Sequence, residues 1–168
     1  MGNDPSYFKG DNLPVEQVSW DDCKEFIGRL NELTGLVFRL PTEAEWEFAA
    51  RGGNNSRGYQ YAGGNNLSEV AWYRDNSGKK PHPVKTKRPN ELGLYDMSGN
   101  VWEWCQDCFG DYSSELQTDP AGSADARFRV YRGGSCRNDA GFCRVANRDY
   151  STPNDRVYPL GLRLALSE

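Results

Sequence analysis

The sequence predicts an α+β domain with two short helices, a small antiparallel sheet and a low content of regular secondary structure. Three observations support this prediction. Segments 19–35 and 41–53 carry apolar residues at helical spacing. Several later segments have the alternating or aromatic composition of strands. Glycine, proline and aromatic residues are abundant, and only 37% of the 168 residues are hydrophobic, which is typical of a loop-rich fold.

The first helix is expected over 19–35. Ser19 can cap its amino end, and Asp22 completes a capping-box pattern three residues later. Gly35 is placed to end the helix. One side is expected to be buried because apolar residues recur along it at spacings of three and four, at Trp20, Cys23, Phe26, Ile27, Leu30 and Leu33.

The second helix is expected over 41–53. Thr42 and Glu45 form another capping-box pattern, and Gly52-Gly53 can end the helix. Its inward-facing residues are expected to be Trp46, Ala49 and Ala50.

The stretch 54–90 has almost no periodicity and predicts a long ordered loop, which the aromatic residues Tyr59, Tyr61, Trp72 and Tyr73 could hold by packing. Short strands are expected after it, at 100–107, 127–134, 143–149 and 161–167. We find no repeat and no linker, so the chain is expected to be a single domain, 1–168.

Charge and hydropathy exclude several function classes. The net charge is -4 and the basic residues do not cluster beyond the KTKR run at 85–88, so no nucleic-acid partner is expected. No apolar run is long enough for a transmembrane segment, and no signal peptide is visible in this chain.

The cysteines allow more than one interpretation. Five are present, so at least one is unpaired, and Cys105 and Cys108 have C-x-x-C spacing. This spacing is compatible with a redox or zinc site. The zinc site would need two further ligands, and His82 is the only histidine. The other interpretation is a pair of partly buried structural thiols on a strand.

Four motifs in order, VSWDDCKEFIGRLNELTGLVFRLPTEAEWEFAARGG, ELGLYDMSGNVWEWCQD, RVYRGGSCRNDAGFCRVANR and LGLRLAL, together resemble the formylglycine-generating-enzyme (sulfatase-modifying factor) family. The resemblance runs from about Leu13 to Leu166. It implies a C-type-lectin-like fold of the formylglycine-generating-enzyme type. Members usually carry more amino-terminal sequence, so the resemblance also implies a domain that is truncated at this end, its first strand region missing or replaced.

The resemblance does not extend to an intact catalytic site. The enzymes use a reactive cysteine pair that binds copper and oxidises a substrate cysteine, which requires thiolates. Their cysteines lie in a C-x4-C segment followed by tyrosines. Here Cys136 and Cys143 lie seven apart, and the FCRVANR segment lacks the tyrosines. We therefore predict no catalytic residues and no catalytic cofactor. The alternative is a formylglycine-generating-type copper oxidase or its inactive accessory paralogue.

The resemblance also implies a structural Ca²⁺ in the LYDMSGNVWEW segment, because Ca²⁺ takes six to eight oxygen ligands. The implied ligands, through carboxylates or backbone carbonyls, are Asp96, Gly99, Val101 and Glu103. In the other interpretation, Glu103 only forms a salt bridge or caps the turn.

The carboxyl-terminal part has the composition of a diversified region. From Ser135 to Pro159 there is no Lys, Glu, Gln, Met or Trp, and every residue there can be encoded by a codon ending in a pyrimidine. Such residues can all arise from asparagine codons whose adenines are randomised. This resembles the variable proteins of diversity-generating retroelements, whose variable region lies at the carboxyl end of the same fold. The variable region is expected at 131–160, between fixed segments RGGS, CRVANR and LGLRLAL.

We therefore expect a non-catalytic ligand-binding protein whose diversified side chains point to solvent from a scaffold that does not depend on them. The partner is expected to be a protein or glycan on another cell surface, and the chain to be secreted or at the cell surface. The predicted ligand-binding residues are Tyr131, Cys136, Arg137, Asp139, Phe142, Asp149, Tyr150, Ser151, Asp155, Val157, Tyr158 and Pro159.

Overall fold

The computed structural model describes residues 4–115, 117–118, 120, 122 and 127–167. Its elements in chain order are α1 (Trp20–Thr34), β1 (Val37–Arg39), α2 (Glu43–Ala50), a 3₁₀ turn η1 (Gly53–Asn55), α3 (Leu67–Val70), β2 (Trp102–Cys108), β3 (Arg129–Arg132), η2 (Ala140–Cys143), β4 (Arg148–Ser151), β5 (Leu160–Leu162) and β6 (Ala165–Ser167). Among these helices, none is long and apolar enough to span a bilayer. The predicted α+β class with little regular structure is confirmed.

Both predicted helices form with the predicted amino-terminal caps, but α2 ends at Ala50 with Arg51 as its carboxyl cap, before the predicted end at Gly52-Gly53. At α1 the Ser19 hydroxyl accepts the Asp22 N–H and the Asp22 carboxylate accepts the Ser19 N–H, so the capping box is complete. Gly35 ends this helix in the left-handed region, at φ 69°. At α2 the same box joins Thr42 and Glu45. These local hydrogen bonds satisfy helix-end groups and fix where each helix begins.

The main sheet has the strand order β4-β3-β2-β5. Neighbouring strands are antiparallel except for β5, which runs parallel to β2. A separate two-stranded sheet pairs β1 with β6 antiparallel. The sequence did not predict β1, because three residues directly after a helix are too few to show a periodicity.

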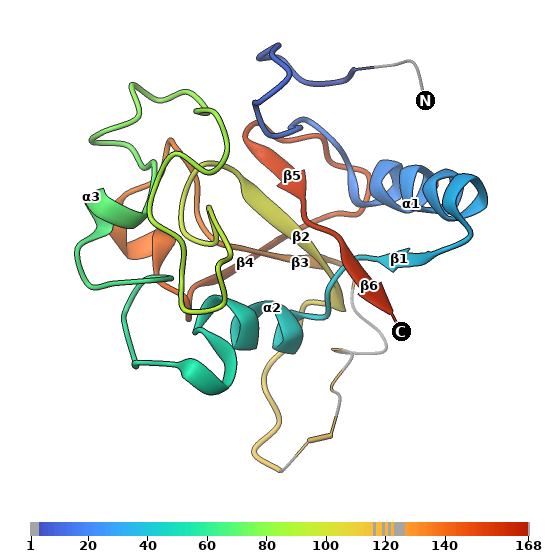
Figure 1. Ribbon diagram of the computed structural model, residues 1–168. Helices are drawn as coiled ribbons and strands as arrows, with labels where there is room; N and C mark the ends of the chain where they lie inside the picture. Colours follow the sequence, from blue (N-terminus) through green and yellow to red (C-terminus); the bar gives the residue numbers. More distant parts are fainter. Residues whose placement is uncertain (1–3, 116, 119, 121, 123–126, 168) are drawn as a thin grey trace.

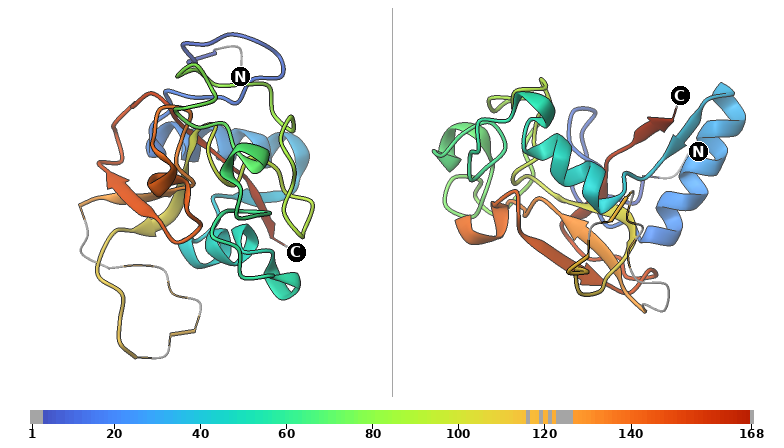
Figure 2. Two further views of the ribbon diagram at one scale, coloured as in Figure 1. Left: turned by 90° about the vertical axis from the view of Figure 1, so that its left-hand side faces the viewer. Right: turned by 90° about the horizontal axis from the view of Figure 1, so that it is seen from below.

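The four-stranded sheet lies between two apolar layers. Strand alternation points Trp102 and Trp104 toward α1, where they pack with Cys23 and Ile27. The opposite side of the sheet faces α2, and its packed residues are Trp46, Ala50, Met97, Cys105, Val130 and Val145. Figure 1 shows the long loop stretch, green to yellow, on the opposite side of the molecule from α1, and both views in Figure 2 agree.

The strand predicted at 143–149 is wrong in position, because the observed strand begins later in the chain. Cys143 ends the 3₁₀ turn η2, and β4 begins only at Arg148. The backbone of this segment bonds to loops instead of to a strand, because the Cys143 carbonyl accepts the Ser98 hydroxyl and the Val145 N–H donates to the Gln60 carbonyl. These partners are distant in sequence, so no local pattern indicates them.

The strand predicted at 161–167 is two strands. β5 pairs with β2 and β6 pairs with β1. Arg163 lies between them, and its guanidinium reaches Glu103 and the Tyr95 carbonyl. The predicted alternation of leucines therefore does not describe one buried side, and Leu164 and Leu166 are exposed.

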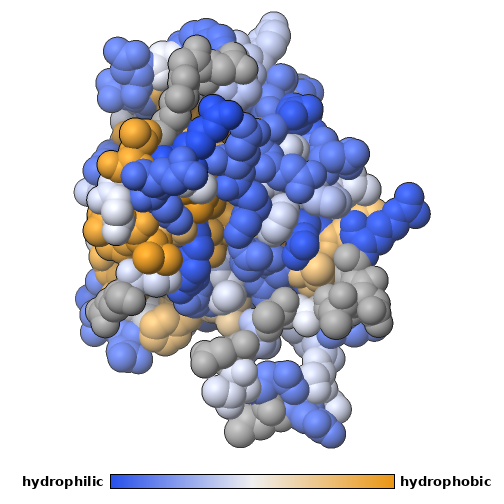
Figure 3. Space-filling view, turned by 90° about the vertical axis from the view of Figure 1, so that its right-hand side faces the viewer, coloured by the Kyte–Doolittle hydropathy of each residue, from blue (hydrophilic) through white to orange (hydrophobic). Residues whose placement is uncertain are grey.

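The inner side predicted for α1 is only partly buried. Cys23 and Ile27 are buried, whereas Phe26 is 37% and Leu33 is 74% exposed. The second half of the helix lies beside β1, where the Asn31 side chain accepts the Phe38 N–H and donates to the Phe38 carbonyl. Figure 3 shows apolar side chains at the surface on this face of the molecule, and Leu33, Val37 and Leu166 are exposed on its elements.

Candidate functional site

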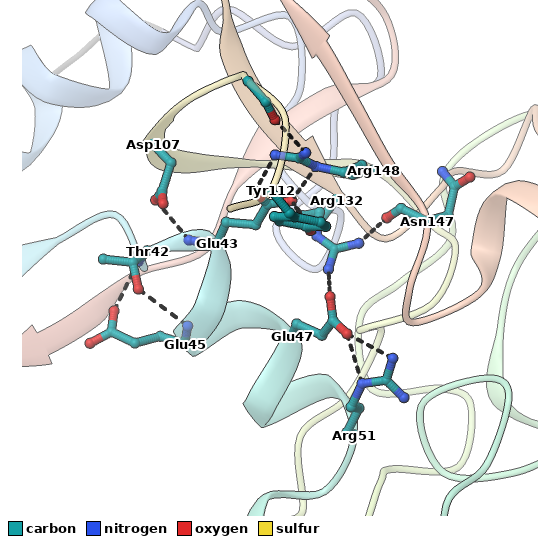
Figure 4. Close-up of polar contacts among 11 residues, drawn as sticks. Thr42, Glu43, Glu45, Glu47, Arg51, Asp107, Tyr112, Arg132, Asn147 and Arg148 are labelled. Carbon is teal, nitrogen blue, oxygen red and sulfur yellow. Dashed lines mark hydrogen bonds and ion pairs between the residues drawn. The ribbon is translucent and has the colours of Figure 1, made fainter. Parts of the chain in front are cut away.

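The segments predicted to be fixed are held by a buried ion network, shown in Figure 4. Arg148 donates from Nε and Nη2 to the carboxylate of Glu43, at 2.8 and 2.6 Å. The Nε of Arg132 lies 3.2 Å from the same carboxylate, and its Nη2 pairs with Glu47. Arg132 is fully buried and Glu43 is 5% exposed. Buried charges are tolerated only when they are paired, so Glu43 fixes both arginines.

A glycine turn follows Arg132. Gly133 and Gly134 adopt φ 99° and 73°, in the left-handed region that favours glycine. A Cβ atom at Gly134 would lie 2.8 Å from both the Phe142 carbonyl oxygen and the Cys143 Sγ. The RGGS turn therefore packs directly beneath the 142–143 backbone, and another residue type at Gly134 would displace it.

The predicted ligand-binding residues differ in exposure. The exposed ones are Arg137, Asp139, Phe142, Tyr150 and Val157. The half-buried ones are Tyr131, Asp149, Ser151, Asp155 and Tyr158. Cys136 and Pro159 are buried.

The expectation that these side chains all point to solvent is therefore wrong for Cys136 and Pro159. The Cys136 N–H donates to the Asn100 carbonyl and its carbonyl accepts the Ser77 hydroxyl, which holds it between two loops. The Pro159 carbonyl accepts the Trp102 N–H, which fixes the start of β5.

β4 divides the predicted binding residues between two sides of the sheet. Tyr131 pairs with Asp149 across the strands, on the side of α1. Burial raises the pKa of the Tyr131 hydroxyl, and the charge of Asp149 adds to this effect. Tyr150 points the other way and packs on Phe109 and Phe128, with ring centroids 4.1 and 5.0 Å apart. Tyr150 therefore does not share a surface with Asp149.

A second group forms around Tyr158. Its hydroxyl lies 3.6 Å from the Cys136 Sγ, and the Arg137 guanidinium lies 5.5 Å from its ring centroid. Tyr7 and Phe8 also contact this ring. The sequence did not predict Tyr7 and Phe8 as site residues, although they form an adjacent aromatic pair in an otherwise polar segment.

The cysteines do not form an accessible thiolate pair. All five are free, and Cys136 and Cys143 have no exposed surface. Burial raises the pKa of the Cys143 thiol to about 12, and burial also raises the pKa of Cys136. Protonated thiols are poor nucleophiles and poor copper ligands. Within the described part of the chain, no three His, Cys, Asp or Glu side chains are grouped so that they could hold a metal.

The residues predicted to hold Ca²⁺ fit that ion in part. Asp96 and Glu103 line the same cavity, of about 430 Å³. Asp96 Oδ1 is buried with no hydrogen-bond partner among the described residues, which leaves this oxygen able to ligate a cation. Glu103, in contrast, accepts two hydrogen bonds from Arg163 and one from Trp46. Calcium therefore stays a prediction, supported by Asp96, and the salt bridge predicted as the alternative for Glu103 is present.

Comparisons with curated proteins identify relatives over nearly the whole chain. Formylglycine-generating enzyme from Streptomyces coelicolor is 40% identical over 173 residues, covering 92% of this chain and 52% of the relative. The enzyme from Mus musculus is 35% identical, covering 98% of this chain and 47% of the relative. The chain thus spans about half the length of these enzymes.

Among solved structures, Treponema denticola variable protein 1 superposes with a TM-score of 0.90 at 35% identity, covering 98% of this chain and 77% of that chain. PvdO from Pseudomonas aeruginosa gives a TM-score of 0.82 at 28% identity, covering 96% and 65%. The family described as sulfatase-modifying factor enzyme 1-like domain matches residues 1–168. The predicted resemblance is confirmed, and the chain belongs to the sulfatase-modifying-factor family.

Proposed function

We propose that this chain is a non-catalytic ligand-binding protein, a retroelement variable protein whose region 131–160 is diversified on a C-type-lectin-like scaffold. The observation that carries this proposal is the similarity to variable protein 1, at a TM-score of 0.90 over 98% of the chain. The composition of Ser135–Pro159 supports it, because all its residues are reachable from asparagine codons changed at adenines.

The packing of the region also supports the proposal. Arg137 and Val157 are exposed, so their identity contributes little to the core. Phe142 is also exposed, at 42%, and its ring meets the core only at the edge of Trp102. Residues of the fixed segments between them, such as Val145 and Leu160, are buried. Aromatic and arginine side chains on a rigid support are suited to binding because little conformational entropy is lost. At Cys136 and Pro159, substitution would be limited to side chains that fit the interior.

The second candidate is a formylglycine-generating-type copper oxidase or its inactive accessory paralogue. The identity of 40% to the Streptomyces coelicolor enzyme favours it. The positions of Cys136 and Cys143 also favour it, because the two thiols lie close enough that ionisation of Cys136 would raise the pKa of Cys143. The burial of both thiols opposes it, since copper binding needs accessible thiolates.

We propose a protein or glycan on another cell surface as the partner, which would require this chain to be secreted or displayed at a cell surface. A nucleic-acid partner is not proposed, because the net charge is -4.

Sequencing the surrounding DNA tests the main proposal. We expect a nearby copy of the stretch encoding 131–160 that differs only at adenines, beside a reverse transcriptase gene. A locus that lacks both would contradict diversification. The alternative is tested by incubating the purified chain with copper, oxygen and a cysteine-containing peptide. Formylglycine in the peptide would contradict a non-catalytic role, and unreacted peptide is expected. Alkylation of the native chain should modify Cys108, which is half-buried, before Cys136 and Cys143.

A further inference from the structure

We propose that Tyr7 and Phe8, which lie outside the variable region, form one contact surface with Tyr158 and Arg137, and that this surface binds an acidic segment of a partner protein. We call these residues the aromatic platform. The inference rests on the proposed function, because Tyr158 and Arg137 are among the residues proposed to be diversified. It adds Tyr7 and Phe8, which lie outside the region proposed to be diversified and would be the same in every copy.

The platform is continuous. The rings of Tyr7 and Phe8 are 5.0 Å apart in an edge-to-face arrangement. The Phe8 ring centroid is 5.6 Å and the Tyr7 ring centroid 6.5 Å from that of Tyr158. Arg137 lies over the same Tyr158 ring at 5.5 Å. Residues separated by about 150 positions in sequence therefore form one patch.

The loop that carries Tyr7 is held rigidly. The Phe8 N–H donates to the Glu16 carboxylate at 2.9 Å, and the Glu16 N–H donates to the Ser6 hydroxyl at 3.2 Å. Glu16 has no exposed surface and Ser6 is 6% exposed. The charge of Glu16 also contributes to the raised pKa of Tyr158 and of Cys136, so this carboxylate lies beneath the platform. A surface fixed before binding loses less entropy when a partner binds.

The Tyr7 side chain contributes little to the stability of the fold. It is 71% exposed, and its hydroxyl has no hydrogen-bond partner in the part of the chain described. Tyrosine and arginine are enriched among the residues that contribute most to binding at protein interfaces. An exposed tyrosine on a fixed loop beside Arg137 has the character of such a residue.

The charges around the platform indicate the partner's chemistry. The Tyr158 hydroxyl donates to the Lys79 carbonyl at 3.1 Å, which places the 79–80 loop beside it. Lys79, Lys80 and Arg137 are exposed, and none forms an ion pair with a described residue. Unpaired cations at one place on a chain of net charge -4 favour an acidic contact.

The composition of the platform favours a protein over a small ligand. Surface cavities of about 430, 660 and 800 Å³ are lined by other residues and not by the platform. Small molecules and single sugars bind in concave sites, whereas protein interfaces use flatter patches of this composition.

The test uses short random peptides displayed on phage and selected against the full chain. The affinity of the selected peptides is then measured by fluorescence anisotropy. The variants are Tyr7→Ala, Arg137→Glu and the matched control Leu33→Ala, whose side chain on α1 is 74% exposed, as against 71% for Tyr7. We expect acidic peptides, with the Kd raised about tenfold or more by Tyr7→Ala and by Arg137→Glu. We expect no change in the control, and equal melting temperatures for all chains.

Other results would overturn the inference. Selected peptides with neutral or positive charge, or acidic peptides that still bind Tyr7→Ala, would contradict it. Binding to a glycan array that depends on Tyr7, without any peptide binding, would contradict the protein partner. If peptides lose affinity for Phe142→Ala but not for Tyr7→Ala, the platform is wrong and the proposed function stands. If neither Phe142→Ala nor Tyr7→Ala lowers the affinity for any peptide, the platform and the proposed function are both wrong.

Discussion

The guanidinium of Arg148 meets the carboxylate of Glu43 through two hydrogen bonds, at 2.8 and 2.6 Å, and so joins the start of β4 to the start of α2. Removing one partner of a buried pair leaves an uncompensated charge, which costs about 3–5 kcal/mol. We expect Arg148→Ala to lower the free energy of unfolding by this amount in urea denaturation. The exposed pair of Arg156 with Asp22 is the control, and Arg156→Ala should cost at most about 1 kcal/mol. Equal costs for the two variants would contradict the role given to Glu43.

Substitution at the exposed residues of the proposed variable region should leave the fold unchanged. Val157 is 47% exposed, so Val157→Ser should change the free energy of unfolding by about 0.5 kcal/mol or less. Phe142→Ser also removes an edge-to-face contact with Trp102 and should cost about 1 kcal/mol. Leu160, at 1% exposure, belongs to the fixed segments, and Leu160→Ala should cost about 2–5 kcal/mol. Thermal and urea denaturation measure both effects. A large cost at Phe142 would show that the region is part of the core.

Asp107 should make the protein less stable as the pH rises. Burial raises the pKa of its carboxyl to about 6, and the charge of Glu43 adds to this effect. In the unfolded chain the pKa is about 3.9, so the folded state holds this proton more tightly. Stability from this group is complete below about pH 4 and is lost as the pH rises through 6, by at most about 3 kcal/mol.

Asp107→Asn isolates this contribution. The amide oxygen can still accept the Glu43 N–H, which donates to Asp107 at 2.7 Å. We expect the variant to be more stable than the parent chain at neutral pH, with the difference shrinking toward pH 4. Urea denaturation across this pH range measures the difference. A constant difference between the two chains would contradict the raised pKa.

Calcium, if bound near Asp96, should stabilise the folded chain. Ligand at about 100 times its Kd adds about 2.7 kcal/mol, which is visible as a rise in melting temperature. We expect this rise with Ca²⁺ and not with Mg²⁺, because the larger ion accepts irregular oxygen ligands. Asp96→Ala should abolish it, since Oδ1 is the unpartnered oxygen. An unchanged melting temperature of the parent chain would show that the calcium prediction is wrong.

Local signals predicted the helices well. The boxes at Ser19 and Thr42 and the stop at Gly35 depend on residues within a few positions of one another, and the structure contains all three. The aromatic run of β2 was also found, because its tryptophans have the composition of a buried strand. The fold class followed from these elements together with the family resemblance.

Contacts between residues far apart in the sequence determine the parts of the fold and of the site that local patterns did not predict. Nothing around Cys143 indicates that its carbonyl accepts a hydrogen bond from Ser98, so the predicted strand there was misplaced. The contact of Tyr7 with Tyr158 joins the two ends of the chain and has no local pattern. The exposure of each side chain in the proposed variable region could not be predicted either. The composition of a segment indicates which residue types it contains, but not which side chains point to solvent.

Arg132 and Arg148 approach the same carboxylate from the two ends of the segment 133–147. That segment is therefore a loop closed on Glu43, and Gly134 packs beneath its far side. Adding or removing a residue would pull one arginine off its partner, whereas exchanging an exposed side chain leaves both in place. The proposed diversification would therefore change side chains in this loop while the length of the loop stays constant, as expected of a process that replaces single bases.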